Sequence, residues 1–168
     1  MTIAVVLVSA GKGLRLGQQV PKAAVSIAGK TLLELSLERI AEFKPDQLVV
    51  VAPEDLKADF EKMTSEFFPK YVVVAGGTTR QQSVAAGIAE VTADLVLVHD
   101  AARAFTPSAV FDRVSAALSE ADCVVPAINL SDTVKQVAEG TVDKTLDRQS
   151  LRLIQTPQGF RTSTLREG

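Results

Sequence analysis

Residues 9–22 contain side chains and glycines suited to binding an anion. They read SAGKGLRLGQQVPK and directly follow the first apolar segment of the chain. Small residues let backbone N–H groups approach an anion closely, Arg15 and Lys22 add positive charge, and Pro21 restricts the backbone before Lys22. We therefore predict a phosphate-binding loop; the alternative from this pattern is a glycine-rich turn with two solvated cations. The small residues concerned are Ser9, Ala10, Gly11 and Gly13.

Two common nucleotide motifs do not fit this loop. Its glycines are spaced Gly-x-Gly-x-x-x-Gly, one residue longer than the dinucleotide-binding fingerprint, and Arg15 lies between them. Gly29, Lys30 and Thr31 resemble the end of a Walker A motif, but Ala24 occupies the position of its first glycine. We therefore predict a loop that binds an anion but is neither a dinucleotide-binding fingerprint nor a Walker A motif.

A carboxylate and an arginine follow another apolar segment. In LVLVHDAAR, residues 95–103, Asp100 ends the segment and Arg103 comes three residues later. Because α/β sheets bind ligands at the carboxyl ends of their strands, we expect Asp100 at the same edge as the first loop. It could bind a hydroxyl-bearing substrate, a metal ion, or Arg103 in a structural ion pair. His99 and Asp100 are adjacent in a strand and should point to opposite faces, so we expect no catalytic dyad.

Two further motifs could contact a ligand. In GGTTRQQS, residues 76–83, Arg80 and Ser83 are spaced i and i+3 and fall on one face of a predicted helix start. A helix N-terminus with an arginine suits an anion or a polar base edge. IQTPQGF, residues 154–160, is expected to form a strand ending in a Thr-Pro turn and is weak evidence alone.

Missing catalytic motifs narrow the chemistry further. The sequence has no G-x-S-x-G or H-E-x-x-H motif, and His99 is its single histidine. A phosphate monoester has a second pKa of about 6 and is largely dianionic at neutral pH, so it could attack without a general base. A reaction at this site is therefore expected to use a ready-made nucleophile.

The elements that would position these groups alternate between strand and helix. Short runs rich in Val, Ile and Leu are typical of strands buried on both faces, and segments with helical spacing lie between them. The alternation predicts a doubly wound, mostly parallel α/β sheet in a single domain over residues 1–168. Strands are expected at 3–8, 48–51, 71–74, 95–98 and 123–125, and helices at 32–43, 54–68, 80–90 and 107–120.

Local sequence supports three of the helix starts. Capping boxes are expected at Thr31 with Glu34 and at Thr78 with Gln81. Thr106 is expected to cap a helix with a proline in its first turn.

A different pattern begins after the last predicted strand. Residues 131–148 alternate apolar and polar positions around Glu139 and Gly140, which predicts a two-stranded hairpin. An isolated hairpin is marginally stable in water and needs a surface to pack on. It could be an arm that reaches a partner subunit or an excursion packed on its own domain.

Composition and charge exclude several classes of protein. A formal net charge of -2 argues against a protein that coats nucleic acid. The apolar runs are too short to span a membrane and no secretion signal is evident, so we expect a cytoplasmic protein. The single cysteine, Cys123, allows no internal disulfide and is expected to be a small core residue.

Taken in order, these motifs resemble one enzyme family. SAGKGLRLGQQVPK, GGTTRQQS, HDAAR, SDTVK, TLDR and QTPQGF closely resemble the motifs of the 2-C-methyl-D-erythritol 4-phosphate cytidylyltransferases, over essentially the whole chain. The resemblance implies a Rossmann-like nucleotidyltransferase fold with a β-hairpin dimerisation arm. It implies transfer of CMP from CTP to the sugar-alcohol phosphate, with release of pyrophosphate, in the non-mevalonate isoprenoid pathway. It also implies Mg²⁺ bound mainly through the CTP phosphates, and a homodimer.

The resemblance also implies roles for particular residues. Arg15 and Lys22 would stabilise the transition state at the α-phosphate of CTP. Thr133 and Arg148, on the hairpin, would reach the site of the neighbouring subunit. The residues implied at the nucleotide are Ser9, Ala10, Gly11, Gly13, Gly77, Arg80, Ser83 and Ala101, and those at the acceptor substrate are Asp100, Arg103, Thr133, Arg148 and Thr156.

The chain departs from the family pattern in two places. Thr78 stands where many members have an acidic residue, which leaves base recognition there to backbone groups or to the hydroxyl. Members usually continue for several dozen residues beyond Gly168, so we expect the chain to lack a C-terminal segment. A ribitol-phosphate cytidylyltransferase and a non-catalytic nucleotide-binding or dimerisation module are the alternative functions.

Overall fold

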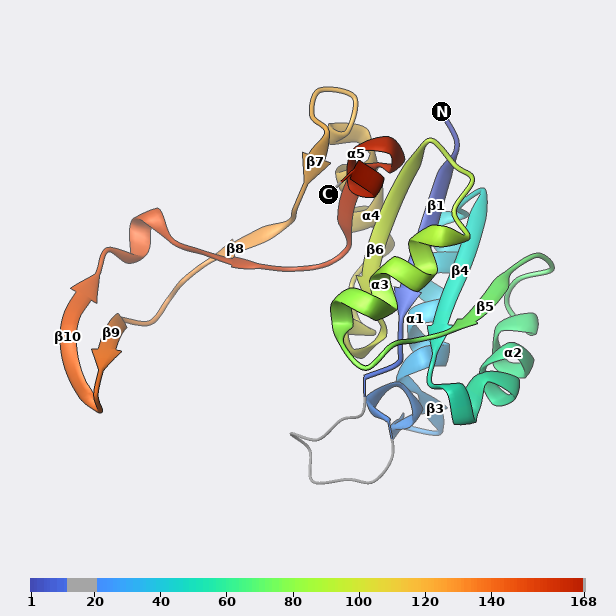
Figure 1. Cartoon of the computed structure of the whole chain (residues 1–168), viewed down its shortest axis with the longest axis horizontal. Coiled ribbons are helices and arrows are strands. Elements are labelled where there is room, and N and C mark those ends of the chain that lie inside the picture. Colours follow the sequence, from blue (N-terminus) through green and yellow to red (C-terminus); the bar gives the residue numbers. More distant parts are fainter. Residues whose placement is uncertain (12–20, 168) are drawn as a thin grey trace.

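The computed structural model describes residues 1–11 and 21–167, and the sheet below is that of these residues (Figure 1). The sheet has six strands in the order β5-β4-β1-β6-β12-β7. The first four in this order run parallel, whereas β12 is antiparallel to both of its neighbours. The strands are β1 Ile3–Val8, β4 Gln47–Ala52, β5 Val72–Ala75, β6 Leu95–Asp100, β7 Cys123–Val124 and β12 Gln158–Arg161. The predicted mostly parallel α/β sheet is confirmed.

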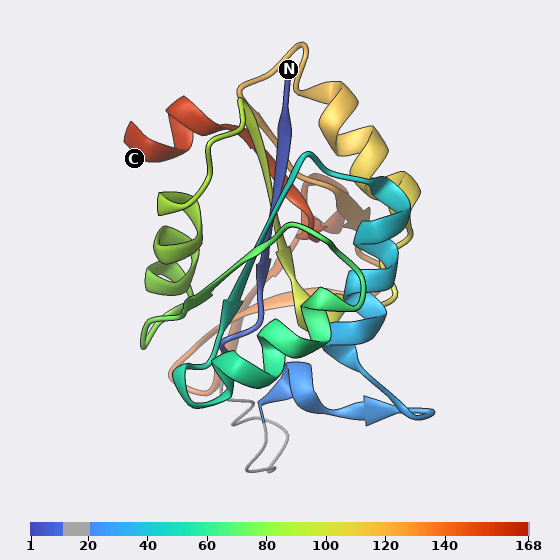
Figure 2. The same ribbon diagram turned by 90° about the vertical axis from the view of Figure 1, so that its right-hand side faces the viewer.

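Helices cover both faces of this sheet (Figure 2). Helices α1 (Leu32–Phe43), α2 (Lys57–Ser65) and α4 (Ser108–Ala117) lie on one face, and α3 (Arg80–Ala89) and α5 (Thr162–Glu167) on the other. Successive β1 residues point to opposite faces, as the pleat requires. Thus Leu7 packs with the α1, α2 and α4 core, and Val6 with the α3 core. The chain is doubly wound, as predicted.

The predicted helix starts are partly confirmed. Thr31 and Glu34 form a capping box, but the box before α3 joins Thr79 and Gln82, one residue later than predicted. The expected cap at Thr106 is wrong, because Pro107 itself occupies the N-cap position of α4. The Thr106 hydroxyl instead donates to the Arg103 carbonyl, at 2.9 Å.

The far side of the sheet differs from the sequence prediction. The segment after the Thr-Pro turn, β12, lies inside the sheet between β6 and β7, and the peptide bond between Thr156 and Pro157 is cis. Strand β7 is a two-residue edge strand, so its Cys123 side chain is exposed. The expectation of a buried Cys123 is therefore wrong, because an edge strand lacks a neighbour on one side.

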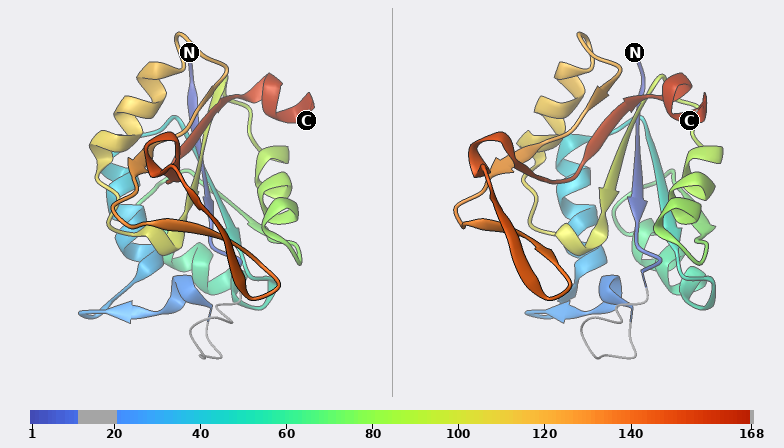
Figure 3. Two further views of the ribbon diagram at one scale, coloured as in Figure 1. Left: turned by 90° about the vertical axis from the view of Figure 1, so that its left-hand side faces the viewer. Right: turned by 60° about the vertical axis from the view of Figure 1, so that its left-hand side comes forward.

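An arm, residues 127–154, extends away from the sheet (Figures 1 and 3). Strands β8 (Ala127–Asn129) and β11 (Arg152–Ile154) form its base as an antiparallel ribbon. Strands β9 (Val134–Ala138) and β10 (Thr141–Leu146) form the predicted hairpin. Its turn has positive φ at both Glu139 (50°) and Gly140 (79°), which matches the right-handed twist of a hairpin. The hairpin is confirmed.

The described helices are those of a chain with short elements, α1 with twelve residues being the longest of them. None of them is both long enough and apolar enough to cross a bilayer.

Candidate functional site

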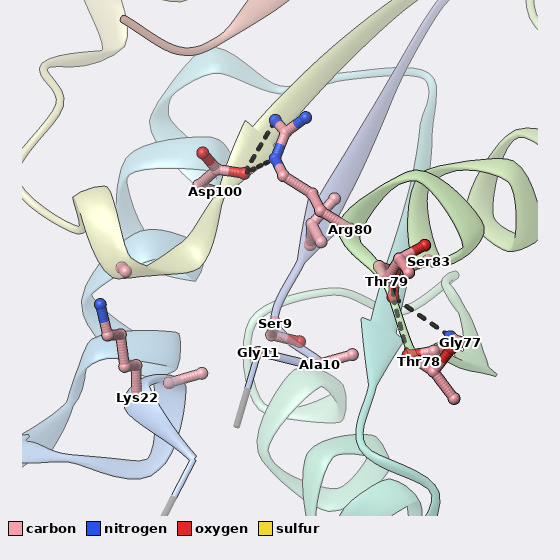
Figure 4. A pocket seen from close by; sticks show the side chains of 13 residues that line it. Ser9, Ala10, Gly11, Lys22, Gly77, Thr78, Thr79, Arg80, Ser83 and Asp100 are labelled. Carbon is pink, nitrogen blue, oxygen red and sulfur yellow. Dashed lines mark hydrogen bonds and ion pairs between the residues drawn. The ribbon is translucent and has the colours of Figure 1, made fainter. Parts of the chain in front are cut away.

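A pocket of about 460 Å³ lies at the carboxyl ends of β1 and β6 (Figure 4). Eight residues predicted from separate motifs line it together, which brings the first loop, the start of α3 and the end of β6 into one site. These residues are Ser9, Ala10, Gly11, Lys22, Gly77, Arg80, Ser83 and Asp100, and the rest of the lining is Val8, Ala23, Thr78, Thr79 and Ala102.

The loop after β1 is fixed to the neighbouring strand. The backbone N–H and the hydroxyl of Ser9 both donate to the Val51 carbonyl, at 2.9 and 2.6 Å. A Cβ atom at Gly76 would lie 2.3 Å from the Cβ of Ala10, so only glycine allows the two loops to approach this closely. Ser9 therefore anchors the loop and has no hydroxyl proton left for a ligand. Gly13 and Arg15 lie outside the described residues.

The loop before α3 uses its own donors internally. Gly77 N–H donates to Ser83 Oγ at 3.1 Å, and Ser83 Oγ donates to the Thr79 carbonyl at 2.9 Å. The N–H groups of Thr78 and Thr79 and the Thr78 hydroxyl all donate to Gln82 Oε1, at 2.9, 3.2 and 2.7 Å. The N–H donors of Gly77, Thr78 and Thr79 are thus engaged. The Thr79 carbonyl also accepts from Ser83 N–H and Oγ, so the carbonyls that precede it are what the loop can offer to a ligand.

Two charged side chains, Lys22 and Asp100, line the side of the pocket that lies across from the Gly77 loop. Lys22 begins the 3₁₀ helix Lys22–Ala24, and its ammonium group faces the hollow across from the Gly77 loop (Figure 4). Asp100 pairs with Arg80, whose Nη2 and Nε lie 3.0 and 3.1 Å from Oδ1. Arg103 Nε lies farther off, 3.9 Å from Oδ2. The carboxylate therefore connects two guanidinium groups and is closer to Arg80 than to the expected partner Arg103.

His99 and Asp100 diverge, as the strand geometry predicts. His99 is only 1% exposed, and its ring packs against Phe111 with centroids 5.0 Å apart. Burial lowers the pKa of His99 to about 4; the charge of Asp100 and a hydrogen bond to the Arg103 backbone oppose the shift without reversing it. The imidazole is neutral at physiological pH and does not line the pocket.

A second cavity, of about 440 Å³, contains the predicted acceptor-side residues Arg103 and Thr156. A hydrogen bond links the linings of the two cavities, since Asp100 N–H donates to Thr156 Oγ1 at 3.4 Å. The Arg103 guanidinium also donates to the Gln155 side chain. The two hollows are therefore separate in lining and joined by hydrogen bonds at the end of β6.

Three predicted residues lie outside both cavities. Ala101 is completely buried and its carbonyl accepts from Ser36 Oγ at 2.9 Å, so Ala102 lines the pocket in its place. Thr133 and Arg148 are exposed on the arm, where the Arg148 guanidinium donates to the Ser131 carbonyl. Within its own chain the structure does not bring either arm residue to the site.

Sequence reasoning missed several residues of the site. Thr79 could have been found from its capping box with Gln82, because that pairing fixes where the loop ends and α3 begins. Ala102 and Gln155 carry no comparable signal, since their positions depend on the 3₁₀ helix Ala101–Arg103 and on the turn before β12.

Comparison with known proteins identifies the family. The model of the 2-C-methyl-D-erythritol 4-phosphate cytidylyltransferases matches residues 3–168. The chain belongs to this family. A cytidylyltransferase of Saccharopolyspora erythraea is 42% identical over 99% of this chain and 78% of its own length. One of Rhodococcus opacus is 42% identical over 94% of the chain and 70% of its own length.

Other relatives of the cytidylyltransferase family are longer proteins or have known structures. The chain covers only 43% of the bifunctional enzyme IspD/IspF of Erythrobacter litoralis, with 39% identity over 98% of the chain. The Anaerococcus prevotii 4-diphosphocytidyl-2C-methyl-D-erythritol synthase superimposes with a TM-score of 0.86 at 28% identity, over 99% of this chain and 74% of that one. The Thermus thermophilus cytidylyltransferase gives 0.78 at 33% identity over the same shares. The resemblance seen in the motifs is confirmed.

Proposed function

We propose that the pocket binds CTP and that the chain transfers its CMP group to 2-C-methyl-D-erythritol 4-phosphate, as its family membership indicates. The observation that carries the assignment to this site is that residues 9–11, Lys22 and the start of α3 line one pocket. A second cavity is lined by Arg103 and Thr156. Two adjoining hollows suit two substrates that must meet.

The base of the nucleotide would lie against the loop before α3. Because the N–H groups of Gly77, Thr78 and Thr79 are engaged, this loop offers carbonyl acceptors. Cytosine carries an exocyclic amino group that donates, whereas uracil has an acceptor at the same position. The loop therefore favours cytosine without the acidic side chain found in many relatives.

The reaction needs no general base. A phosphate oxygen of the acceptor attacks the α-phosphorus of CTP, the bond between that phosphorus and the bridging oxygen breaks, and pyrophosphate leaves with the electron pair. The attacking oxygen carries no proton that must be removed. The buried, neutral His99 agrees with this scheme because it lines neither cavity. Lys22 supplies positive charge to the crowded α-phosphate, and Arg15 is proposed to do the same.

The acceptor would use the second cavity. Asp100 lines the first pocket and Arg103 the second cavity, with Arg103 Nε 3.9 Å from Asp100 Oδ2. A hydroxyl of the acceptor can therefore be bound by the carboxylate and its phosphate by the guanidinium. Thr156 lines the same cavity. In-line phosphoryl transfer depends mainly on such positioning and on charge stabilisation.

Magnesium is proposed to bind mainly through the CTP phosphates. Among the described residues no group of three His, Cys, Asp or Glu side chains gathers to hold a metal ion. Asp100, the one carboxylate in the described pocket lining, is paired with Arg80. This set of donors fits Mg²⁺, which commonly keeps waters and phosphate oxygens as ligands. When bound, the ion would neutralise phosphate charge.

The arm is proposed to pair two copies of the chain in a homodimer. It carries exposed apolar side chains on both ribbons, which a second copy of the chain could cover. In a twofold dimer each arm could bring Thr133 and Arg148 to the acceptor cavity of its partner. The apolar residues are Ile128 (54% exposed), Val137 (58%), Val142 (61%), Leu153 (47%) and Ile154 (47%).

Pyrophosphate release tests the assignment. The full protein that contains this chain is incubated with CTP, Mg²⁺ and either 2-C-methyl-D-erythritol 4-phosphate or ribitol 5-phosphate. We expect rapid release with the first acceptor and little with the second. Release with ribitol 5-phosphate alone would transfer the assignment to that substrate, and CTP binding without any release would indicate a non-catalytic module.

A further inference from the structure

The single histidine of the chain is buried between the residues that we assign to the acceptor. His99 Nδ1 lies 2.9 Å from Thr156 Oγ1, across 57 positions of sequence. Thr156 is itself only 4% exposed, and its oxygen also accepts from the N–H of Asp100. The ring of His99 packs against the ring of Phe111, and the planes of the two rings make an angle of 59°. A polar side chain buried from water destabilises the fold unless it forms a hydrogen bond.

The network decides the direction of this hydrogen bond. Among the described residues, the Thr156 hydroxyl has one hydrogen-bond partner that can accept its proton, His99 Nδ1, and we assign the proton to this bond. Thr156 Oγ1 then accepts from Asp100 N–H and donates to His99. The ring nitrogen Nδ1 is left without a proton, which places the proton of the neutral ring on Nε2.

From this arrangement we infer that His99 is a positioning residue for acceptor binding. It contacts no substrate; it fixes the rotamer of Thr156 and, through the Asp100 backbone, the end of β6 from which the Asp100 carboxylate and Arg103 project. A buried imidazole held by packing and a hydrogen bond is a rigid support for such groups. The nucleotide loops, which are anchored by Ser9 and by the α3 capping box, do not depend on it. The kinetic consequence rests on the proposed function.

Two substitutions separate positioning from simple packing. His99→Phe keeps a ring against Phe111 but has no acceptor for Thr156, whereas His99→Asn leaves a gap beside Phe111 but can place its amide oxygen near Nδ1. His99→Phe also loses the hydrogen bond of the ring to the Arg103 backbone. In the full protein, we expect it to raise the KM for the acceptor roughly tenfold or more, with the KM for CTP unchanged. His99→Asn should restore most of the acceptor affinity even if it melts at a lower temperature.

A matched control removes another buried hydrogen bond nearby. Ser36→Ala deletes the bond from α1 to the Ala101 carbonyl without touching Thr156. We expect it to lower the melting temperature and leave the ratio of the two KM values unchanged. Parallel rises of both KM values in proportion to lost stability, in all three variants, would overturn the positioning role.

A spectroscopic measurement tests the network without any assay. In long-range ¹H–¹⁵N correlation spectra of the tag-free full protein, the imidazole pattern of His99 is assigned by its loss in His99→Phe. We expect a neutral ring protonated on Nε2 from pH 8 down to 5.5, and a changed Nδ1 shift in Thr156→Val. A ring protonated on Nδ1, or charged at pH 6, would overturn the inferred network even if the proposed catalytic activity is confirmed. An intact ring pattern in a protein without activity would count against the proposed function alone.

Discussion

Lys22 is the described cation that enters the nucleotide pocket from the side opposite the Gly77 loop. If its charge stabilises the transition state, Lys22→Met should lower kcat on the order of hundredfold, with little effect on melting temperature. Steady-state pyrophosphate release and thermal unfolding measure the two effects. Lys30→Met is the matched control, because Lys30 is exposed and paired with Glu38 outside the pocket. An equal fall in kcat for both variants would contradict the assignment.

Gly76 and Gly11 lie on facing loops but tolerate a methyl group differently. A Cβ at Gly76 would lie 2.3 Å from the Ala10 Cβ and 2.9 Å from Ser83 Oγ, whereas nothing lies within 4 Å of one at Gly11. Gly76→Ala should therefore destabilise the fold by about 1–3 kcal/mol, measured by urea unfolding. Gly11→Ala should leave stability intact and raise the KM for CTP. Normal stability of Gly76→Ala would show that the loops can move apart.

At this scale, sequence reasoning succeeded where a residue is fixed by its own strand or loop. Ser9 and Asp100 are located by strand ends and Lys22 by the loop after β1, and all three line the predicted pocket. The bond between His99 and Thr156 could not be predicted, because it joins segments 57 positions apart whose side-chain directions depend on β12. Whether Ala101 or Ala102 lines the pocket depends on the direction in which the 3₁₀ helix Ala101–Arg103 points each side chain, and the sequence does not predict that direction.

At the scale of elements, helices α1 and α3 both begin with a capping box, and the box of α3 lies beside the pocket. The Thr79 hydroxyl accepts from Gln82 N–H at 3.1 Å beside the pocket, and the Thr31 hydroxyl accepts from Glu34 N–H at 3.1 Å away from it. Thr79→Ala and Thr31→Ala should each cost about 1 kcal/mol of unfolding free energy. Only Thr79→Ala should also raise the KM for CTP. If both variants leave that KM unchanged, the Gly77 loop does not bind the nucleotide.

The strands that sequence reasoning found are those with an apolar run of their own. Strands β1, β4 and β6 bury almost every side chain, which gives them an unambiguous pattern. Strand β12 lies equally far inside the sheet but has only Gly159 and Phe160 between two polar residues. A Cβ at Gly159 would lie 2.7 Å from Val114, so α4 packs directly on the backbone there. Strand β12 needs a glycine where α4 packs on it, so a search for runs of apolar side chains does not predict this strand.

For the molecule as a whole, the buried His99 makes stability depend on pH. Folding lowers its pKa from 6.5 to about 4, so between these values unfolded chains bind a proton that folded chains do not. The free energy of unfolding should fall by about 1.4 kcal/mol for each pH unit below 6.5, and be level again below about 4. Urea unfolding at pH 7.5 and 5.5 measures the change.

His99→Phe is the control for this pH dependence. Without the imidazole, the difference in unfolding free energy between pH 7.5 and 5.5 should largely disappear. The pKa of the exposed Asp94 is lowered by hydrogen bonds from Thr2, and its influence lies below the ordinary value of 3.8, outside this window. An undiminished pH dependence in His99→Phe would assign it to other groups.

The proposed dimer predicts that two inactive variants complement each other. If Arg148 acts in the partner's site, a mixed dimer of Lys22→Met and Arg148→Ala chains contains one site with both residues intact. After unfolding and joint refolding in equal amounts, about a quarter of wild-type activity should return. Each variant refolded alone serves as the control. No recovery from a mixture that sediments as dimers would show that Arg148 does not act across subunits.

The place of β12 in the sheet also determines the order in which the chain can be assembled during synthesis. Strands β1, β4, β5 and β6 pair with one another and are complete once residue 100 has left the ribosome. In the part of the chain that the structure describes, β7 pairs with β12 alone, through Cys123 with Phe160 and Val124 with Gly159. The whole arm must therefore be made before β7 gains a partner, and until then the edge of β6 is open. A nascent chain halted within the arm exposes that edge, which makes this stage the most prone to misassembly with a neighbouring chain.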